Sequence, residues 1–263
     1  METYILFAKN AFRQNVVYRT NTIIYSVMSM LSLFIQFNIW KTLYIGDKVI
    51  QNINLTEMLT YTVLSTLMSS FTSDKISGFL GAKIRSGEIG GDFIRPINLK
   101  LYLIANQVGN SAYDVAFNFI PVTIITVFFG SFALPSGILN GFAFLLSALL
   151  GIVLIYFIYY VVGLLSFWLK SAGYTHWTMI ALTTLFSGSS IPLWFYPPVL
   201  RSIAEVLPFR FVSFEPISIY LGKASGSQIL ICVFMQIFWI IVIYFLGAFL
   251  WSKAKSRVLV QGG

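Results

Sequence analysis

The chain has 263 residues, of which 57% are hydrophobic and only 10% are charged, and its mean hydropathy is +0.82. Soluble domains carry about 25% charged residues, so this composition excludes an ordinary water-soluble protein and predicts one embedded in lipid. A net charge of +8 would indicate a nucleic-acid partner in a soluble protein. In a membrane protein Lys and Arg gather in cytoplasmic loops instead, and no nucleic-acid partner is expected.

The first residues are too polar to span a membrane. Over residues 2–20 apolar side chains fall near one helical face, and Lys9 and Arg13 fall on another. This pattern predicts an amphipathic interfacial helix over 1–21, with a plain cytoplasmic extension of the first span as the alternative.

The remaining chain, 22–263, is expected to form one all-α membrane domain. About 20 apolar residues cross the hydrocarbon core of a bilayer. Apolar blocks of that length predict six transmembrane helices at 22–45, 55–73, 103–130, 139–169, 175–195 and 228–251. Twelve Lys and Arg residues then fall on the side of the termini and five on the opposite side. The positive-inside rule therefore predicts that both termini are cytoplasmic.

Two connections are longer than a helical bundle needs. The cytoplasmic segment 74–96 mixes apolar and charged residues and ends at Pro96, which predicts a short amphipathic helix that docks a partner or lies on lipid. The extracellular segment 187–222 contains apolar pieces of about 10 residues that prolines interrupt. Pieces this short cannot span, so they predict a re-entrant helical hairpin before the last span.

Polar side chains recur every four residues along the third span, at Asn106, Asn110, Asp114 and Asn118. Intramembrane polar groups face a partner helix or a water-filled cavity. One hypothesis is that they line a pathway, with Asp114 available to a cationic substrate. The alternative, which we favour, is hydrogen bonding between helices of a dimer.

No catalytic or metal-binding set is expected from the sequence. His176 is the one histidine, and the sequence places no acid or nucleophile beside it. The pattern G-x-x-x-x-G-K-[ST] is absent, so the chain has no recognisable nucleotide site of its own.

Two segments carry a resemblance to a known family. The run IRSGEIGGDFIRPINLKLYLIANQVG at 84–109 resembles the cytoplasmic element of ABC-2 type permeases, although Gly-Asp-Phe at 91–93 replaces the apolar run usual there. The run SGSSIPLWFYPPVLRSIAEVLPFRFVSFEPISIYLG at 187–222 is similar to the re-entrant element of the same family. The matching positions are Gly87, Glu88, Arg95, Pro96, Pro192, Pro208, Phe209, Pro216 and Gly222.

The resemblance implies the permease subunit of a bacterial type V ATP-binding cassette exporter in the cytoplasmic membrane. Two copies of a separate ATPase would hold ATP and Mg²⁺, and a second permease, identical or homologous, would complete the pathway. The residues expected to couple to the ATPase are Lys83, Arg85, Gly87, Glu88, Asp92, Arg95 and Pro96. The residues expected to form an outer gate are Pro192, Pro208, Phe209, Glu215 and Pro216.

The substrate is left open among drugs, toxic amphipathic compounds, antimicrobial peptides and lipid-linked glycans, with Asp114 and the apolar spans favouring a hydrophobic or cationic toxic compound. A membrane-embedded enzyme and a channel or non-transporting scaffold remain as alternative functions.

Overall fold

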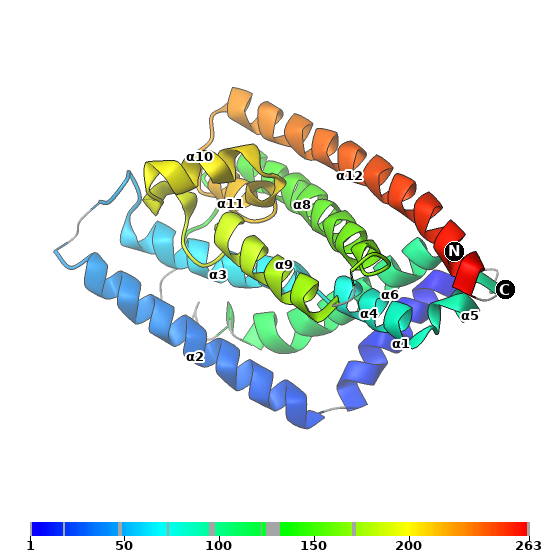
Figure 1. Cartoon of the computed structure of the whole chain (residues 1–263). Helices are drawn as coiled ribbons and strands as arrows, with labels where there is room; N and C mark the ends of the chain where they lie inside the picture. The colour runs from blue at the N-terminus through cyan, green and yellow to red at the C-terminus, as the bar shows by residue number, and fades with distance from the viewer. Residues whose placement is uncertain are drawn as a thin grey trace.

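The computed structural model describes residues 2–17, 19–46, 49–72, 74–94, 98–121, 123–124, 132–169 and 172–261. Over these residues the chain is almost entirely helical (Figure 1) and contains no β-strand, only an isolated bridge between Ile50 and Ile53. An all-α architecture is what the long apolar blocks predict, since a helix satisfies its own backbone in lipid.

The first half of the chain forms two long helices and several shorter ones. Their bounds are α1 Glu2–Val17, α2 Arg19–Leu43, α3 Leu55–Thr72, α4 Ile76–Ser86, α5 Ile89–Ile94 and α6 Leu99–Asp114. A π-helical turn, Val115–Phe119, follows α6 directly.

The second half contains the two longest helices, with a compact group of short helical segments between them. The bounds are α8 Ile138–Leu165, α9 Ala172–Phe186, the 3₁₀ turn Leu193–Phe195, α10 Pro198–Val206, the 3₁₀ turn Pro208–Phe211, α11 Phe214–Tyr220 and α12 Gly226–Gln261.

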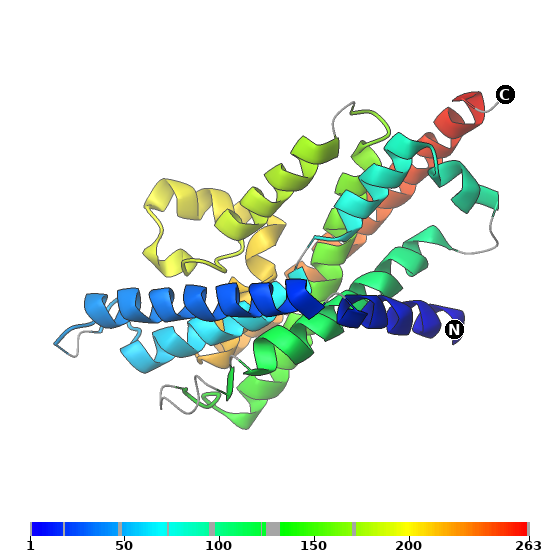
Figure 2. The ribbon, with the colours of Figure 1, turned by 90° about the horizontal axis from the view of Figure 1, so that it is seen from below.

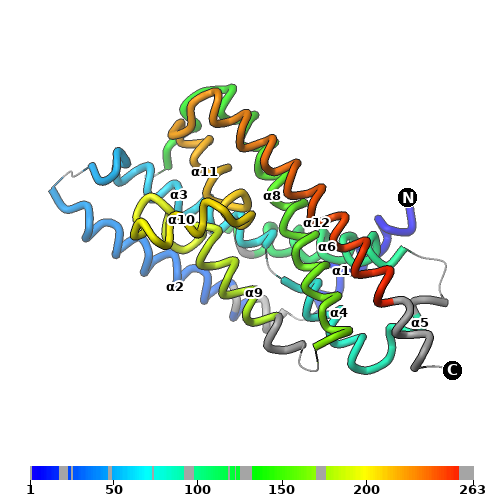
Figure 3. Tube along the Cα trace, turned by 45° about the horizontal axis from the view of Figure 1, so that its top comes forward, coloured from blue at the N-terminus to red at the C-terminus, as the bar shows by residue number. Residues whose placement is uncertain are grey.

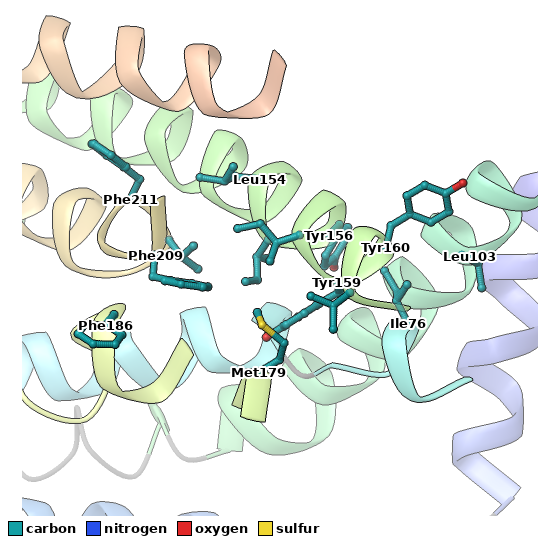
Figure 4. Packing of buried hydrophobic residues seen from close by; sticks show 14 of the residues in the cluster. Ile76, Leu103, Leu154, Tyr156, Tyr159, Tyr160, Met179, Phe186, Phe209 and Phe211 are labelled. Carbon is teal, nitrogen blue, oxygen red and sulfur yellow. The ribbon is translucent and has the colours of Figure 1, made fainter. Parts of the chain in front are cut away.

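Helix α8 is the centre of the fold. It contacts α12, α4, α11 and α9, and most of its second half is buried. Figure 4 shows Tyr159 of α8 beside Met179 of α9, with Ile76 of α4 nearby and Phe209 and Phe211 farther along the same core. The two segments that lie between the predicted spans, 74–96 and 187–222, therefore both pack on this one helix.

The two ends of the molecule carry different elements. Both termini lie at the same end as α4 and α5, whereas α10 and the connection between α2 and α3 lie at the other (Figures 1 and 2). The tube in Figure 3 shows α12 starting beside α11 and running along α8 toward the end that holds the termini. The expected coupling element and the expected gate are thus at opposite ends.

Two helices among the described residues are long and apolar enough to cross a bilayer. They are Ile138–Leu165 and Gly226–Ala254, with hydropathies of 2.5 and 2.8. The other expected spans fall on helices that do not meet both criteria. Helix α9 ends at Phe186, well before residue 195, because Gly188 takes a φ of +75° and Pro192 follows soon after. The third span is interrupted by the π-turn after Asp114.

Candidate functional site

The expected coupling segment forms two short helices that meet at a glycine. Asp74 lies just before the N-cap residue of α4, Lys75, and its Oδ1 accepts a hydrogen bond of 2.8 Å from the backbone N–H of Ser77 in the first turn. Helix α4 ends at Gly87, whose φ of +77° suits a residue without a Cβ. The chain then turns into α5, so the segment is a bent helical pair rather than one helix.

One face of α4 is fixed to the core and the other is open. Leu80 is fully buried against α8 where Gly163 allows close approach, since a Cβ at that glycine would lie 3.0 Å from Leu80 Cδ2. Arg85 and Glu88 are exposed, and Lys83 is partly exposed. The Lys83 ammonium lies 5.0 Å from the centre of the Phe79 ring, within cation–π range. The free end of the element therefore presents charges of both signs.

Three further expected coupling residues lie wholly or partly outside what the structure describes. Arg95 and Pro96 lie outside the described residues, and of Asp92 only the backbone, in α5, is described. Their expected roles remain predictions.

The base of α4 is attached to α9 through a polar cluster that sequence reasoning missed. The Asp74 side chain is fully buried, and its Oδ2 lies 3.0 Å from Nδ1 of His176 in α9. The Ser77 hydroxyl donates to the same Oδ2 and lies 3.4 Å from the same Nδ1. The available signal was that both Asp74 and His176 fall at cytoplasmic ends of predicted spans.

This cluster does not have the layout of a catalytic triad. In a triad the acid orients one imidazole nitrogen while the nucleophile bonds to the other. Here Asp74 and Ser77 both approach Nδ1 of His176, and Ser77 is buried. The arrangement is suited to holding α4 against α9 rather than to activating a nucleophile.

The base of α4 is also attached to α6. The Lys75 ammonium lies 3.6 Å from Oδ2 of Asp114, the last residue of α6 before the π-turn. Such π-turns are frequent at functional sites, where they re-aim the side chains beside them. Asp74 and Lys75, adjacent in sequence, thus connect the coupling segment to two different helices.

The polar stripe of the third span faces α1 of the same chain over part of its length. Asn15 of α1 donates a hydrogen bond of 2.6 Å to Oδ1 of Asn110, whereas Asn106 bonds to the carbonyl of Tyr102 in its own helix. Asn106 and Asn110 line a cavity of about 370 Å³ bounded by α1, α4 and α6. The side chain of Asn118 lies outside those described.

Helix α1 follows α6 closely and in the same direction. The Tyr4 hydroxyl accepts a hydrogen bond from the Asn98 backbone at one end, and Phe12 packs edge-on against Tyr113 at the other. Between them Gly109 touches the backbone of α1, where a Cβ would overlap the carbonyl of Ala8. Helix α1 is therefore seated on α6, which falls in the predicted third span.

The expected gate segment is folded tightly against the core. Ser187 and Gly188 hold its entrance: the Ser187 carbonyl accepts from the Phe214 backbone at 3.0 Å, and the Gly188 carbonyl accepts from the Tyr61 hydroxyl at 2.7 Å. The expected gate residues Pro192, Pro208, Phe209 and Pro216 are all buried within it. The segment is a packed set of turns and short helices.

A buried glutamine attaches this segment to the two longest helices. Gln236 of α12 is completely buried, and its Nε2 donates to the carbonyls of Ser147 in α8 at 2.8 Å and Phe211 at 2.9 Å. Sequence reasoning passed over Gln236, although a lone amide inside an apolar span is a signal for such a contact.

Charges gather at the outer end of the same segment. Arg210 Nη1 lies 3.5 Å from Glu215 Oε1, and Lys223 Nζ lies 2.7 Å from Glu57 Oε1. Burial raises the pKa of Glu215, which lies between the predicted spans; Arg210 opposes this rise and Glu205 adds to it. Glu215 is thus a partly desolvated carboxylate whose charged form Arg210 favours.

Comparison with known proteins identifies the family. A search of curated proteins returns no matching relative. The family model described as "ABC-2 family transporter protein" matches residues 23–262, which is nearly the whole chain and includes both segments described above. The chain therefore belongs to the ABC-2 family of transporter proteins.

Proposed function

We propose that the chain is the permease subunit of an ATP-binding cassette exporter, forming part of the translocation pathway and driven by separate ATPase subunits. Membership of the ABC-2 family supports a membrane transport role. Since the sequence contains no G-x-x-x-x-G-K-[ST] motif, the ATP and Mg²⁺ would be held by two ATPase partners.

The observation that carries the proposal is the construction of the segment around α4 and α5. Its tip exposes Arg85 and Glu88, which suits a charged docking site on a soluble partner. Its base is joined to α9 through Asp74 and to α6 through Lys75. A displacement of this tip by a partner would therefore be transmitted to α6 and α9 through two adjacent residues. Coupling to an ATPase requires such a transmission.

The proposed topology has six spans with both termini in the cytoplasm of a bacterial cell. It is supported by the excess of Lys and Arg on the terminal side and by the shared end of the termini, α4 and α5 (Figure 2). Segment 187–222 would then be a re-entrant hairpin at the outer end, acting as a gate. A second permease, identical or homologous, would complete the pathway.

The cavity beside Asn106 and Asn110 is a candidate entry point on the cytoplasmic side. Its lining combines the amide groups of these two residues with the rings of Phe7, Phe79 and Tyr102. A mixed polar and aromatic lining suits an amphipathic compound. A drug, a toxic amphipathic compound or an antimicrobial peptide would meet that description. The layout of Asp74, Ser77 and His176 gives no comparable support to a membrane-embedded enzyme.

Co-purification tests the permease assignment. A tagged chain would be purified from cells that express it naturally, and any captured ATPase would be quantified together with its ATP hydrolysis. The double variant Arg85→Gln, Glu88→Gln is expected to reduce capture about tenfold, because it removes two exposed charges of the tip. The control variant Arg201→Gln, Glu205→Gln removes one Arg and one Glu at the opposite end and should capture ATPase normally. Equal capture by all three proteins would contradict the assignment of the coupling element.

A further inference from the structure

A second cavity lies at the outer end of the molecule, away from α4. It has a volume of about 290 Å³ and is bounded by α10, the turn Pro208–Phe211, α11 and the first turns of α12. Figure 1 shows α10 and α11 beside the start of α12. Drug-sized ligands occupy cavities of about 300–1,000 Å³, so this one suits a small group.

The lining of this cavity is charged in a balanced way. Arg201 Nε lies 3.0 Å from Glu205 Oε1, and Arg210 and Glu215 form a second pair of the same composition. Lys223 also lines the cavity, but it lies against Glu57, which balances its charge. A group that carries one positive and one negative charge would match this lining without leaving an ion unbalanced.

Arg210 lines the cavity and pairs with Glu215 through a single nitrogen, Nη1. Its Nε is buried and has no hydrogen-bond partner among the described residues, a costly state for a polar atom. A guanidinium presents five N–H donors in a fork that matches phosphate oxygens. Arg210 therefore has donors beyond its contact with Glu215 that suit an anionic oxygen.

Apolar surface flanks the charged cavity on both sides. Val199, Ile203 and Val206 form one largely exposed face of α10, whereas Arg201 and Glu205 on the same helix line the cavity. This is the pattern of a helix that lies in the headgroup region of a bilayer. The first turns of α12 expose a second apolar strip at Leu230, Ile231 and Phe234.

We propose that this cavity binds the headgroup of phosphatidylethanolamine, with the phosphate on Arg201 and Arg210 and the ammonium on Glu205 and Glu215. The acyl chains would run along the exposed strip of α12. A primary ammonium donates hydrogen bonds to carboxylates, which the trimethylammonium of phosphatidylcholine cannot do. Phosphatidylglycerol has no cation, so it would offer Glu205 and Glu215 no partner beyond their own arginines. The inference rests on the proposed function only in placing this chain in a membrane.

The test uses the purified full chain in lipid nanodiscs with equal amounts of palmitoyl-oleoyl phosphatidylethanolamine, phosphatidylcholine and phosphatidylglycerol. Native mass spectrometry then counts the lipids retained after stepwise removal. Wild-type protein is expected to retain phosphatidylethanolamine last. In Arg201→Gln, Glu205→Gln this preference should fall about tenfold, as expected when charge-assisted contacts are lost. Both side chains are about half exposed, at 51% and 47%, so the variant is expected to fold.

The matched control is Arg85→Gln, Glu88→Gln, which should keep the wild-type lipid preference. The inference is overturned if Arg201→Gln, Glu205→Gln retains phosphatidylethanolamine as wild type does, or if wild type prefers phosphatidylglycerol. Soluble O-phosphoethanolamine should bind far more weakly than the lipid, and equal affinity would refute a lipid site. No ATPase is present, so failure here leaves the permease proposal standing, and failed ATPase capture leaves the lipid site standing.

Discussion

Gly151 is the residue of α8 against which the backbone of the expected gate segment, 187–222, packs most closely. Its replacement by alanine should loosen that contact. A Cβ at Gly151 would lie 2.7 Å from the carbonyl oxygen of Phe211 and 3.2 Å from Cα of Val212. All of these neighbours are backbone atoms, which cannot rotate away as a side chain would. Reaching an ordinary contact of 3.4 Å requires a shift of roughly 0.7 Å in a packed core.

The cost of that shift can be set against the benefit of alanine in a helix. Overpacking a core costs about 1–3 kcal/mol, and replacing a helical glycine by alanine returns about 0.5–1 kcal/mol. The midpoints of the two ranges give an expected net loss in the free energy of unfolding of about 1–1.5 kcal/mol. For a chain of this size it corresponds to a decrease in Tm of roughly 2–6 °C.

Thermal unfolding of the purified chain measures this effect, with Gly141→Ala as the matched control in the same helix. A Cβ at Gly141 would lie 3.7 Å from Pro135 Cγ, an ordinary contact, so this variant should gain about 0.5–1 kcal/mol. Trypsin should also cleave at the exposed Arg201 faster in Gly151→Ala than in Gly141→Ala. If both variants raise Tm equally, the close contact between Gly151 of α8 and the backbone of Phe211 and Val212 is wrong.

Three further changes probe the other contacts. Gln236→Leu should lower the free energy of unfolding by about 1–3 kcal/mol, because it leaves the Phe211 carbonyl buried without its donor. Chemical denaturation would measure this loss, and an unchanged midpoint would contradict the contact. In a double-mutant cycle, Asp74→Asn and His176→Phe should show a coupling energy of about 1–3 kcal/mol, and additive effects would mean that the two residues act independently. Lys75→Asp should reduce ATP hydrolysis stimulated by the permease while changing Tm little, because an ion pair whose side chains are 39% and 20% exposed contributes only about 0–1 kcal/mol. Asp114→Lys added to Lys75→Asp should restore that stimulation, and no rescue would count against the contact.

The helical class and the positions of most helices could be predicted from the sequence because the apolar blocks are long and the breakers between them are clear. The start of α8 at Ile138 lies within a residue of its predicted position. The early end of α9 was harder to predict, because apolar residues continue past the turn at Gly188 and on both sides of Pro192, which together end the helix. The π-turn after Asp114 has no signal in apolar periodicity.

Contacts between distant polar residues were the least predictable part of the site. The spacing of Asn106 and Asn110 predicts that they face a partner helix or a cavity. Their contact with α1 could not be predicted, because it depends on how α1 and α6 pack side by side in the fold. Asp74 and His176 meet because α4 and α9 converge on α8, and no spacing in the sequence encodes that convergence. The gate, coupling and pathway roles assigned from the sequence stay predictions.

The seating of α1 on α6 has a consequence for how the chain is assembled during synthesis. Asn15 and its partner Asn110 are 95 residues apart, and α1 leaves the ribosome long before α6 exists. At about 5–20 residues per second, α1 waits roughly 5–20 s for its binding surface. During that interval the apolar side chains that α6 later covers lack their protein neighbours, and the surface of the membrane would suit them. The pairing of α1 with α6 therefore comes late in the synthesis of the N-terminal half, after residue 110 has been made.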